Sequence, residues 1–208
     1  MEVFTSPMAC SLASHITVLE AGLPARITYV DTKAKKTADG RDYRAIAPNG
    51  YVPCVALDDG RVLNENPSVL QYLADRKPES GLAPAWGTHE RYELIDALNY
   101  LGTEVHKKVF SPLFNPNMPD AGKEVAKAAI APTMEALTKR LGGRNHLVGD
   151  KFTVADAYLI VMLNWFGFVG VDIAQWPALA AYHKLHLARP AVAKAMAAEM
   201  AERQRRAA

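Results

Sequence analysis

The sequence predicts an α/β fold in its first third, followed by an all-helical part. Three observations favour this division. Up to about residue 77, short runs of β-branched and aromatic residues alternate with stretches of helical periodicity. Residues 78–86 are rich in proline, glycine and serine, which is typical of a linker. Beyond them every apolar pattern has helical spacing, so we predict domains at 1–77 and 87–208.

A parallel strand–helix–strand unit opens the chain. Residues 3–4 begin an apolar strand, and residues 12–19 carry apolar side chains three and four positions apart, as a helix does. Glycine and proline at 22–24 end that helix, and residues 27–30 are β-branched and aromatic. A connection of this length predicts parallel strands joined by a right-handed crossover.

A short helix, a hairpin and a longer helix complete the α/β part. We expect the short helix over residues 42–47. The Asp-Gly turn at 59–60 separates two apolar runs and predicts a β-hairpin. Pro53 stands at the start of the first hairpin strand, where a cis peptide bond is plausible for an X–Pro pair. Asn66 and Pro67 have the residue types that begin a helix.

The second part reads as helices throughout. Leucines and valine step by four and three over residues 94–105, and a break is expected over residues 111–119. A further helix spans residues 130–141. Thr153 and Asp156 have the spacing of a capping box, so we assign Asp156 to the fold and not to catalysis.

The composition indicates the cellular compartment and excludes some classes of binding partner. The chain has 208 residues, half of them hydrophobic and 22% charged, with a net charge of +2. No basic block long enough to follow a phosphate backbone is present, so no nucleic-acid partner is expected. No apolar run of about 18 residues and no leader-like start is found, so no membrane partner is expected either. Two cysteines make no disulfide scaffold, and together these features predict a cytoplasmic protein.

Cys10 is the residue around which the first part is organised. It lies where the first strand passes into the first helix, and the free N–H groups of a first helical turn favour an anion. A cysteine at such a place has a physical reason to be a reactive thiolate. Ser11 adds a hydroxyl donor beside it. The alternative is that Cys10 is a small buried apolar residue, as free cysteines often are.

Four segments in this order resemble the cytosolic glutathione transferases: Ser6–Ser11, Pro48–Pro53, Glu65–Leu73 and Leu147–Asp156. Cysteine at position 10 is similar to the bacterial beta class, as are residues 98–100, 104–107 and 110–116. The resemblance covers nearly the whole chain. It implies a thioredoxin-like N-terminal domain with strands and helices in the order βαβ-α-ββα, followed by an all-α domain.

The resemblance also implies a site for glutathione. The backbone of Val52, beside a cis Pro53, would pair with the cysteinyl unit like an added strand. Glu65 would accept the γ-glutamyl ammonium, and the backbone N–H at Asn66 would take the γ-glutamyl carboxylate. The implied glutathione contacts are Ser11, Lys35, Tyr51, Val52, Pro53, Glu65, Asn66, Asn99, Glu104 and Lys107. Asn99 and Glu104 are implied to reach glutathione on the partner subunit of a homodimer.

Cys10 and His106 are the implied catalytic residues, and a wall for an apolar electrophile is implied by Phe110, Leu113, Phe114, Trp165 and Phe168. Structural alternatives remain for several of these side chains. Glu65 has the alternative of a helix-start acid, Lys35 and Lys107 that of surface lysines, and Trp165 that of a core residue. His15, on an apolar helical face, is expected to be a core histidine.

The predicted function is a glutathione transferase that conjugates or reduces small hydrophobic electrophiles. Cys10 would hydrogen-bond the glutathione sulfur or form a mixed disulfide with it. Position 13 is alanine, so a C-x-x-C disulfide is excluded and glutathione itself would release Cys10. The alternatives are a glutathione-dependent thiol–disulfide reductase, a ligand-binding stress protein, and a catabolic dehalogenase or isomerase. Glutathione is the expected co-substrate, with no metal.

Overall fold

The computed structural model describes residues 1–207, which form two compact units. One unit contains residues 1–83 together with residues from 188 onward, and the other contains residues 84–187. The predicted domain limits, 1–77 and 87–208, stay a prediction. The structure adds to them that the last segment of the chain packs with the first unit.

The first unit is built on a five-stranded sheet with the order β3-β2-β1-β4-β5. β1 pairs in parallel with β2 and antiparallel with β4, which sets Val3 opposite Ile27 on one side and Val55 on the other. The strands are β1 Glu2–Thr5, β2 Arg26–Asp31, β3 Lys36–Thr37, β4 Cys54–Ala56 and β5 Val62–Asn64. The parallel unit and the hairpin are as predicted. The two-residue β3 was not predicted, because its polar residues carry no apolar alternation.

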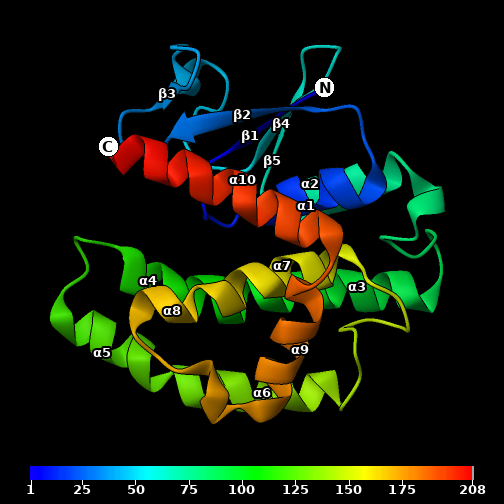
Figure 1. The fold of residues 1–208 in the computed structure, drawn as a ribbon, viewed down its shortest axis with the longest axis vertical. Coiled ribbons are helices and arrows are strands. Elements are labelled where there is room, and N and C mark those ends of the chain that lie inside the picture. Colours follow the sequence, from blue (N-terminus) through cyan, green and yellow to red (C-terminus); the bar gives the residue numbers. More distant parts are fainter. Residues whose placement is uncertain (208) are drawn as a thin grey trace. The chain divides into compact units, whose positions relative to one another are not determined.

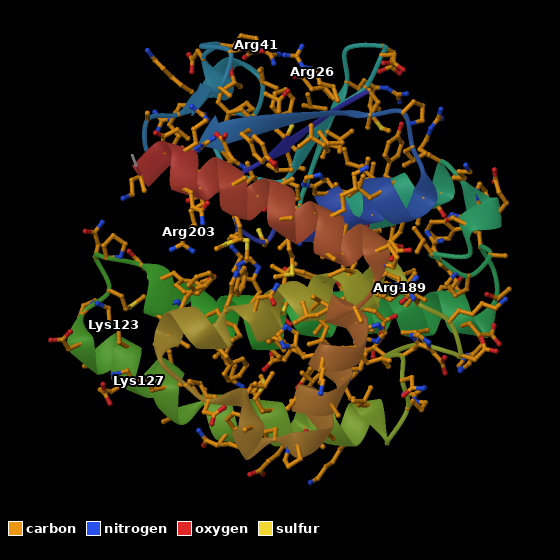
Figure 2. The ribbon with its side chains drawn as sticks, viewed as in Figure 1. Arg26, Arg41, Lys123, Lys127, Arg189 and Arg203 are labelled. Carbon is orange, nitrogen blue, oxygen red and sulfur yellow. The ribbon has the colours of Figure 1, made fainter. Side chains whose placement is uncertain are left out.

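Three helices lie along one side of this sheet in Figure 1: α1 Leu12–Ala21, α2 Asn66–Asp75 and α10 Pro190–Ala207. α1 packs against both α2 and α10. Arg189, labelled in Figure 2, joins α10 to α1 through two hydrogen bonds to the Glu20 carboxylate, at 2.7 and 3.0 Å. Two short 3-10 turns, η1 Tyr43–Ala45 and η2 Pro78–Ser80, complete the unit.

Successive residues of β1 point to opposite faces of the sheet, as a strand requires. Val3 belongs to a core that includes Val18 of α1 and Leu73 of α2. Phe4 belongs to the core on the other face, with Tyr43 of η1. The β1 strand therefore anchors both the helices that carry the candidate site and the turn that carries Tyr43.

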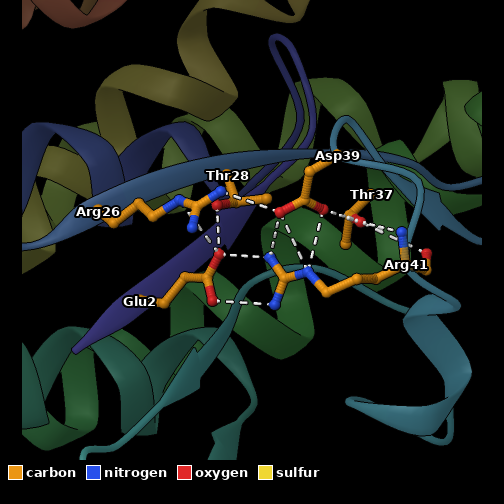
Figure 3. A network of polar contacts seen from close by, with 6 residues as sticks. All are labelled: Glu2, Arg26, Thr28, Thr37, Asp39 and Arg41. Atoms are coloured by element: carbon orange, nitrogen blue, oxygen red, sulfur yellow. Dashed lines mark hydrogen bonds and ion pairs between the residues drawn. The ribbon is translucent and has the colours of Figure 1, made fainter.

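A network of exposed charges ties the β3 turn to the start of the sheet (Figure 3). The Arg41 guanidinium donates to Glu2 at 2.6 Å and to Asp39 at 2.8 Å, and Arg26 donates to Asp39 at 2.9 Å. The hydrogen bonds from Arg41 hold the pKa of Asp39 well below its usual range. Water screens such exposed pairs, so we assign the network to fixing the turn and not to a large share of the stability.

The second unit is helical. Its elements are α3 His89–Tyr100, the π-helix η3 Leu101–Phe110, α4 Ser111–Phe114, α5 Asp120–Ala128, α6 Ile130–Leu141, α7 Val154–Asn164, α8 Phe166–Val169, η4 Ile173–Gln175 and α9 Pro177–Leu187. Leu94, Leu98, Leu101 and Val105 are fully buried, as their spacing predicts. The break expected from residue 111 begins only at Asn115, because Pro112 fits in the first turn of α4.

The capping box predicted at the start of α7 is confirmed. Each oxygen of the buried Asp156 carboxylate accepts two hydrogen bonds. Oδ1 accepts from the Leu147 N–H at 2.7 Å and the Tyr182 hydroxyl at 2.5 Å. Oδ2 accepts from the Thr153 N–H at 2.7 Å and the Thr153 hydroxyl at 3.0 Å. His146 and His186 bring ligand-type nitrogens within 4.8 Å of this carboxylate. The four donors commit Asp156 to the fold.

Within residues 1–207 the apolar helical stretches all fall short of what a bilayer crossing requires.

Candidate active site

Cys10 lies in the turn between β1 and α1, as the sequence predicts, and is partly exposed. Its thiol donates a hydrogen bond to the backbone oxygen of Val52, with 3.3 Å between Sγ and oxygen. The Val52–Pro53 peptide bond is cis, which confirms that expectation. The first helix and the loop before β4 therefore meet at the sulfur.

The Ser11 hydroxyl closes the turn that carries Cys10. Ser11 is fully buried, and its Oγ accepts from the Ser6 N–H at 3.0 Å and donates to the Ser6 oxygen at 3.4 Å. The hydroxyl thus bridges the two ends of the turn. The predicted contact of Ser11 with glutathione stays a prediction, and the structure gives this residue a fold-forming role as well.

The Glu199 carboxylate of α10 supports the turn that carries Cys10. Glu199 is fully buried; its Oε2 accepts from the Met8 N–H at 2.8 Å and its Oε1 from His15 Nδ1 at 3.1 Å. Burial raises the pKa of Glu199, and the bonds to His15 and Met8 oppose that shift. Met8 has a positive φ of 62°, uncommon for a residue with a side chain. His15 is a core histidine, as expected.

Three consecutive carbonyl groups before Pro53 each accept a hydrogen bond from a side chain. Gly50 accepts from Lys35 Nζ at 2.9 Å, Tyr51 from the Tyr43 hydroxyl at 2.8 Å, and Val52 from Cys10. Gly50 has a positive φ of 64°, a conformation that favours glycine. A Cβ at this position would also come within 2.9 Å of the Lys35 side chain. The loop that offers the Val52 peptide group is therefore held from two sides.

Tyr43 is fully buried, packs on Phe4 with ring centroids 5.5 Å apart, and lies close to the Cys54 thiol. Burial, followed by the neighbouring Cys54, raises the pKa of Tyr43, so its hydroxyl stays protonated and donates. Burial also raises the pKa of Cys54 to about 11, which keeps this second cysteine a thiol in the core, as the sequence suggested. Tyr51 is 70% exposed beside the Lys35 ammonium, which lies 5.3 Å from its ring centre.

The N-terminal end of α2 adds an exposed carboxylate and a buried amide. Glu65 is exposed and has a positive φ of 67°, a conformation that costs about 1–3 kcal/mol and persists where surrounding structure imposes it. Asn66 is only 5% exposed and turns its side chain inward, toward Cys10. The backbone of this helix start and the Glu65 side chain are what the site offers to a ligand.

His106, on η3 of the helical unit, shares a hydrogen bond of 2.7 Å between its Nδ1 and the buried Tyr158 hydroxyl. Its ring centre lies 5.0 Å from that of Trp165. Burial, and to a smaller degree the neighbouring Lys107, lowers the pKa of His106 to about 4. The imidazole is therefore neutral near pH 7, with Nδ1 already engaged.

The predicted wall for an electrophile divides into buried and exposed members. Phe110 and Trp165 are buried, with ring centres 5.3 Å apart. Phe114 is 42% and Phe168 45% exposed, and Leu113 is half-buried. The ring centres of Phe114 and Trp165 lie 5.4 Å apart, with the two ring planes nearly perpendicular. The rings of Phe110 and Trp165 both contact the Phe114 ring, which is the core role that was one alternative for Trp165.

Three predicted contacts of the helical unit lie on or near its surface. Asn99 and Lys107 are exposed, and Glu104 is half-buried and forms an ion pair of 2.9 Å with Lys108, one helical turn further on. Their roles toward glutathione stay predictions. Three residues that hold candidate residues within their own unit were not predicted: Tyr43 and Glu199 in the first unit, and Tyr158 in the helical unit. Glu199 and Tyr158 act on residues 191 and 52 positions away, and Tyr43 acts on Tyr51, eight positions away. No local pattern marks any of these pairs.

Comparisons with known proteins show which family the chain belongs to. The N-terminal domain of glutathione S-transferases matches residues 7–76, and the C-terminal domain of glutathione S-transferases matches residues 84–185. The chain therefore belongs to the glutathione S-transferase family, and the predicted two-part fold of that family is confirmed. Glutathione S-transferase GstA of Escherichia coli O157:H7 is 38% identical over 199 residues, which cover 96% of this chain and 98% of that protein.

Two solved structures of bacterial glutathione S-transferases are similar to nearly the whole chain. A sphingomonad glutathione S-transferase complexed with glutathione is 47% identical, with a TM-score of 0.92, and the match covers 96% of this chain and 98% of that one. A beta-class glutathione S-transferase of Sphingomonas chungbukensis is 45% identical, with a TM-score of 0.92 and the same coverage. The resemblance to the bacterial beta class is thus confirmed.

Proposed function

We propose that this chain is an enzyme that uses glutathione to conjugate or reduce small apolar electrophiles, with Cys10 at the glutathione sulfur. The observation that carries the proposal is the contact between the Cys10 thiol and the Val52 oxygen, next to the cis Pro53. That carbonyl and its peptide neighbour are the groups with which an extended peptide pairs as an added strand. The family membership and the glutathione-bound relative support the choice of ligand.

The remaining ligand contacts follow from charge. Glutathione carries an ammonium and a carboxylate at its γ-glutamyl end. Glu65 is exposed and accepts the ammonium, and the backbone N–H groups at the start of α2 accept the carboxylate. Lys35, beside Tyr51, serves the glycyl carboxylate, in addition to its bond to Gly50. Ser11, Pro53, Asn99, Glu104 and Lys107 complete the proposed set.

Cys10 supports two reactions. In conjugation its thiol donates to the glutathione thiolate, which attacks the electrophile. In reduction the Cys10 thiolate attacks the glutathionyl sulfur of a mixed disulfide, and the other thiolate leaves and takes up a proton. A second glutathione thiolate then attacks the Cys10–glutathione bond, which releases oxidised glutathione and restores Cys10. The partial exposure of the sulfur favours keeping this second activity.

We assign His106 the neutral tautomer in which Nδ1 accepts from the Tyr158 hydroxyl, so that Nε2 carries the proton and donates. The exposed rings of Phe114 and Phe168, with Leu113, form the apolar surface for the electrophile, and Phe110 and Trp165 support them. We also propose a homodimer, in which Asn99 and Glu104 face the partner's glutathione, as the family resemblance implies. Both cysteines are thiols, which favours a cytoplasmic setting.

Glutathione titration tests the ligand assignment. Glu65→Gln removes the charge that accepts the ammonium, and a hydrogen bond to a charged group is worth about 1.5–3 kcal/mol, or roughly 10- to 150-fold in Kd. Glu79→Gln, an exposed acid in the segment after α2, is the matched control and leaves Kd unchanged. Equal glutathione affinity for both variants contradicts the proposed site.

Turnover tests the function itself. The wild-type protein is offered an aryl halide, an epoxide and a glutathione mixed disulfide at a fixed, saturating glutathione concentration. We expect product from at least one of them, and Phe114→Ala raises KM for the electrophile without changing Kd for glutathione. Tight glutathione binding with no turnover across the panel would favour the ligand-binding alternative.

A further inference from the structure

The Asn66 side chain connects the two helix starts that frame the proposed glutathione site. Asn66 is the first residue of α2 and is only 5% exposed. Its Nδ2 donates to the backbone oxygen of Cys10 at 3.1 Å, and its Oδ1 accepts from the Ser14 hydroxyl at 3.4 Å. Both partners lie at the start of α1, so this one amide joins α2 to the turn that carries the sulfur.

We propose that Asn66 is a positioning residue, whose side chain fixes the backbone of Cys10 and does not contact glutathione. The inference rests on the proposed function, in which the backbone at position 66 and the Glu65 side chain hold the γ-glutamyl end. The side chain then has a separate role, because it keeps the Cys10 sulfur at a constant distance from Glu65 and so lets one ligand reach both.

The hydrogen bonds fix the amide as well as the backbone. The Cys10 oxygen also accepts from the Ala13 N–H at 3.2 Å, which belongs to the first turn of α1. The Cys10 carbonyl can only accept, so it determines that Nδ2 faces Cys10, and the Ser14 hydroxyl donates to Oδ1 at the other end of the amide. Rotation away would leave the buried amide of Asn66 without its partners, which is unfavourable.

The length of the side chain is part of the argument. Nδ2 of asparagine stands one bond further from the backbone than the hydroxyl of serine, and alanine has no donor. Neither substitution spans the distance to the Cys10 oxygen. The loss frees the start of α1 while Glu65 and the backbone of α2 remain, so the effect falls on the reaction at the sulfur more than on the affinity for glutathione.

Three variants test the assignment: Asn66→Ala, Ser14→Ala and Ser68→Ala. Ser68 is exposed in the first turn of α2 and serves as the control. Three quantities are measured on the full chain: hydrogen–deuterium exchange of the segment 6–14, Kd for glutathione by calorimetry, and kcat at saturating glutathione with the best electrophile of the panel.

Asn66→Ala removes both hydrogen bonds of the amide. We expect faster exchange in segment 6–14, a kcat lowered about fivefold, and a Kd within about twofold of wild type. Ser14→Ala raises the exchange rate of segment 6–14 and lowers kcat by smaller amounts. If Asn66→Ala fails to fold, Ser14→Ala serves as the test. Ser68→Ala changes none.

A glutathione Kd weakened tenfold with unchanged exchange would mean that the side chain touches the ligand, and it overturns the proposal. Unchanged exchange together with unchanged kcat overturns it too. If the wild-type protein binds no glutathione, the proposed function fails, whereas the exchange comparison still decides whether Asn66 holds the start of α1.

Discussion

Cys10 and Val52 are hydrogen-bonded through a thiol and a carbonyl oxygen 3.3 Å apart. The thiol of the proposed reactive residue is thus bonded to the same carbonyl oxygen that the proposed ligand would use. An incoming cysteinyl N–H and the thiol share one acceptor, whose two lone pairs allow both bonds during ligand entry. In the proposed complex, the ligand and the Cys10 thiol are therefore held at the same peptide group.

The first prediction concerns Cys10→Ala. The variant keeps glutathione affinity within a few-fold, because the ligand contacts at Glu65 and Val52 remain. It loses the glutathione-dependent reduction of mixed disulfides, because no sulfur is left to form the intermediate. The measurement is oxidised glutathione formed per minute from a small mixed disulfide. Cys54→Ala, which removes the buried thiol, is the control and stays active; full activity of Cys10→Ala would exclude the covalent role.

The second prediction concerns Tyr43→Phe. The ring stays packed on Phe4, and only the hydroxyl that donates to the Tyr51 oxygen is lost. Loss of one buried hydrogen bond costs about 1 kcal/mol, and the loop before Pro53 gains freedom. We expect KM for glutathione to rise about fivefold with kcat nearly unchanged. Tyr72→Phe on α2 is the control. An unchanged KM would show that the loop does not depend on this hydroxyl.

The third prediction follows from the lowered pKa of His106. The value of about 4 in the folded chain lies below the ordinary value of 6.5, so the unfolded chain binds the proton first as pH falls. The stabilisation by this group is present above pH 6.5 and is lost progressively down to about pH 4, by roughly 3 kcal/mol. Urea unfolding at several pH values measures it.

His106→Asn removes this titration and flattens the fall in stability between pH 6.5 and 4. His183 also has a pKa lowered to about 4, by its burial, so part of the fall remains. His89→Asn is the control, since His89 is exposed. Equal slopes for wild type and His106→Asn would mean that His106 is not buried as a neutral ring.

The fourth prediction concerns Asp156→Asn in the capping box. Four donors point at the carboxylate, and an amide would aim its own N–H groups at some of them. The expected loss is roughly 3 kcal/mol in the free energy of unfolding, measured in urea. Asp150→Asn, an exposed acid shortly before the cap, leaves stability within about 0.5 kcal/mol. A similarly small loss of unfolding free energy for Asp156→Asn would mean that the capping box contributes little to stability.

The order of strands and helices could be predicted from local pattern alone. The spacing of Leu94, Leu98 and Leu101 indicated a helical core, and the Asp-Gly turn indicated the hairpin, because propensity and periodicity act over a few residues. β3 and the π-helix η3 escaped prediction. β3 is too short to show alternation. The π-helix η3 differs from an α-helix in its i→i+5 hydrogen bonds, which the residue types do not reveal.

The candidate site was predictable only in part. Residue type and helix position drew attention to Cys10, Glu65 and the cis Pro53. The inward turn of Asn66 and the support of Met8 by Glu199 could not be read from the sequence, because each partner lies far along the chain. Glu199 stands 184 residues from His15, and an isolated glutamate on a helix looks like a surface residue.

Helix α10 gives the first unit an unusual order of assembly. The strands and α1 leave the ribosome early, but the Glu199 carboxylate, which accepts from Met8 and His15, is translated only after residues 84–187. The helical unit, residues 84–187, is continuous and is translated before α10. A nascent chain stalled before residue 188 would therefore carry Cys10 on a turn that lacks its support, and the turn gains that support only after α10 has been made.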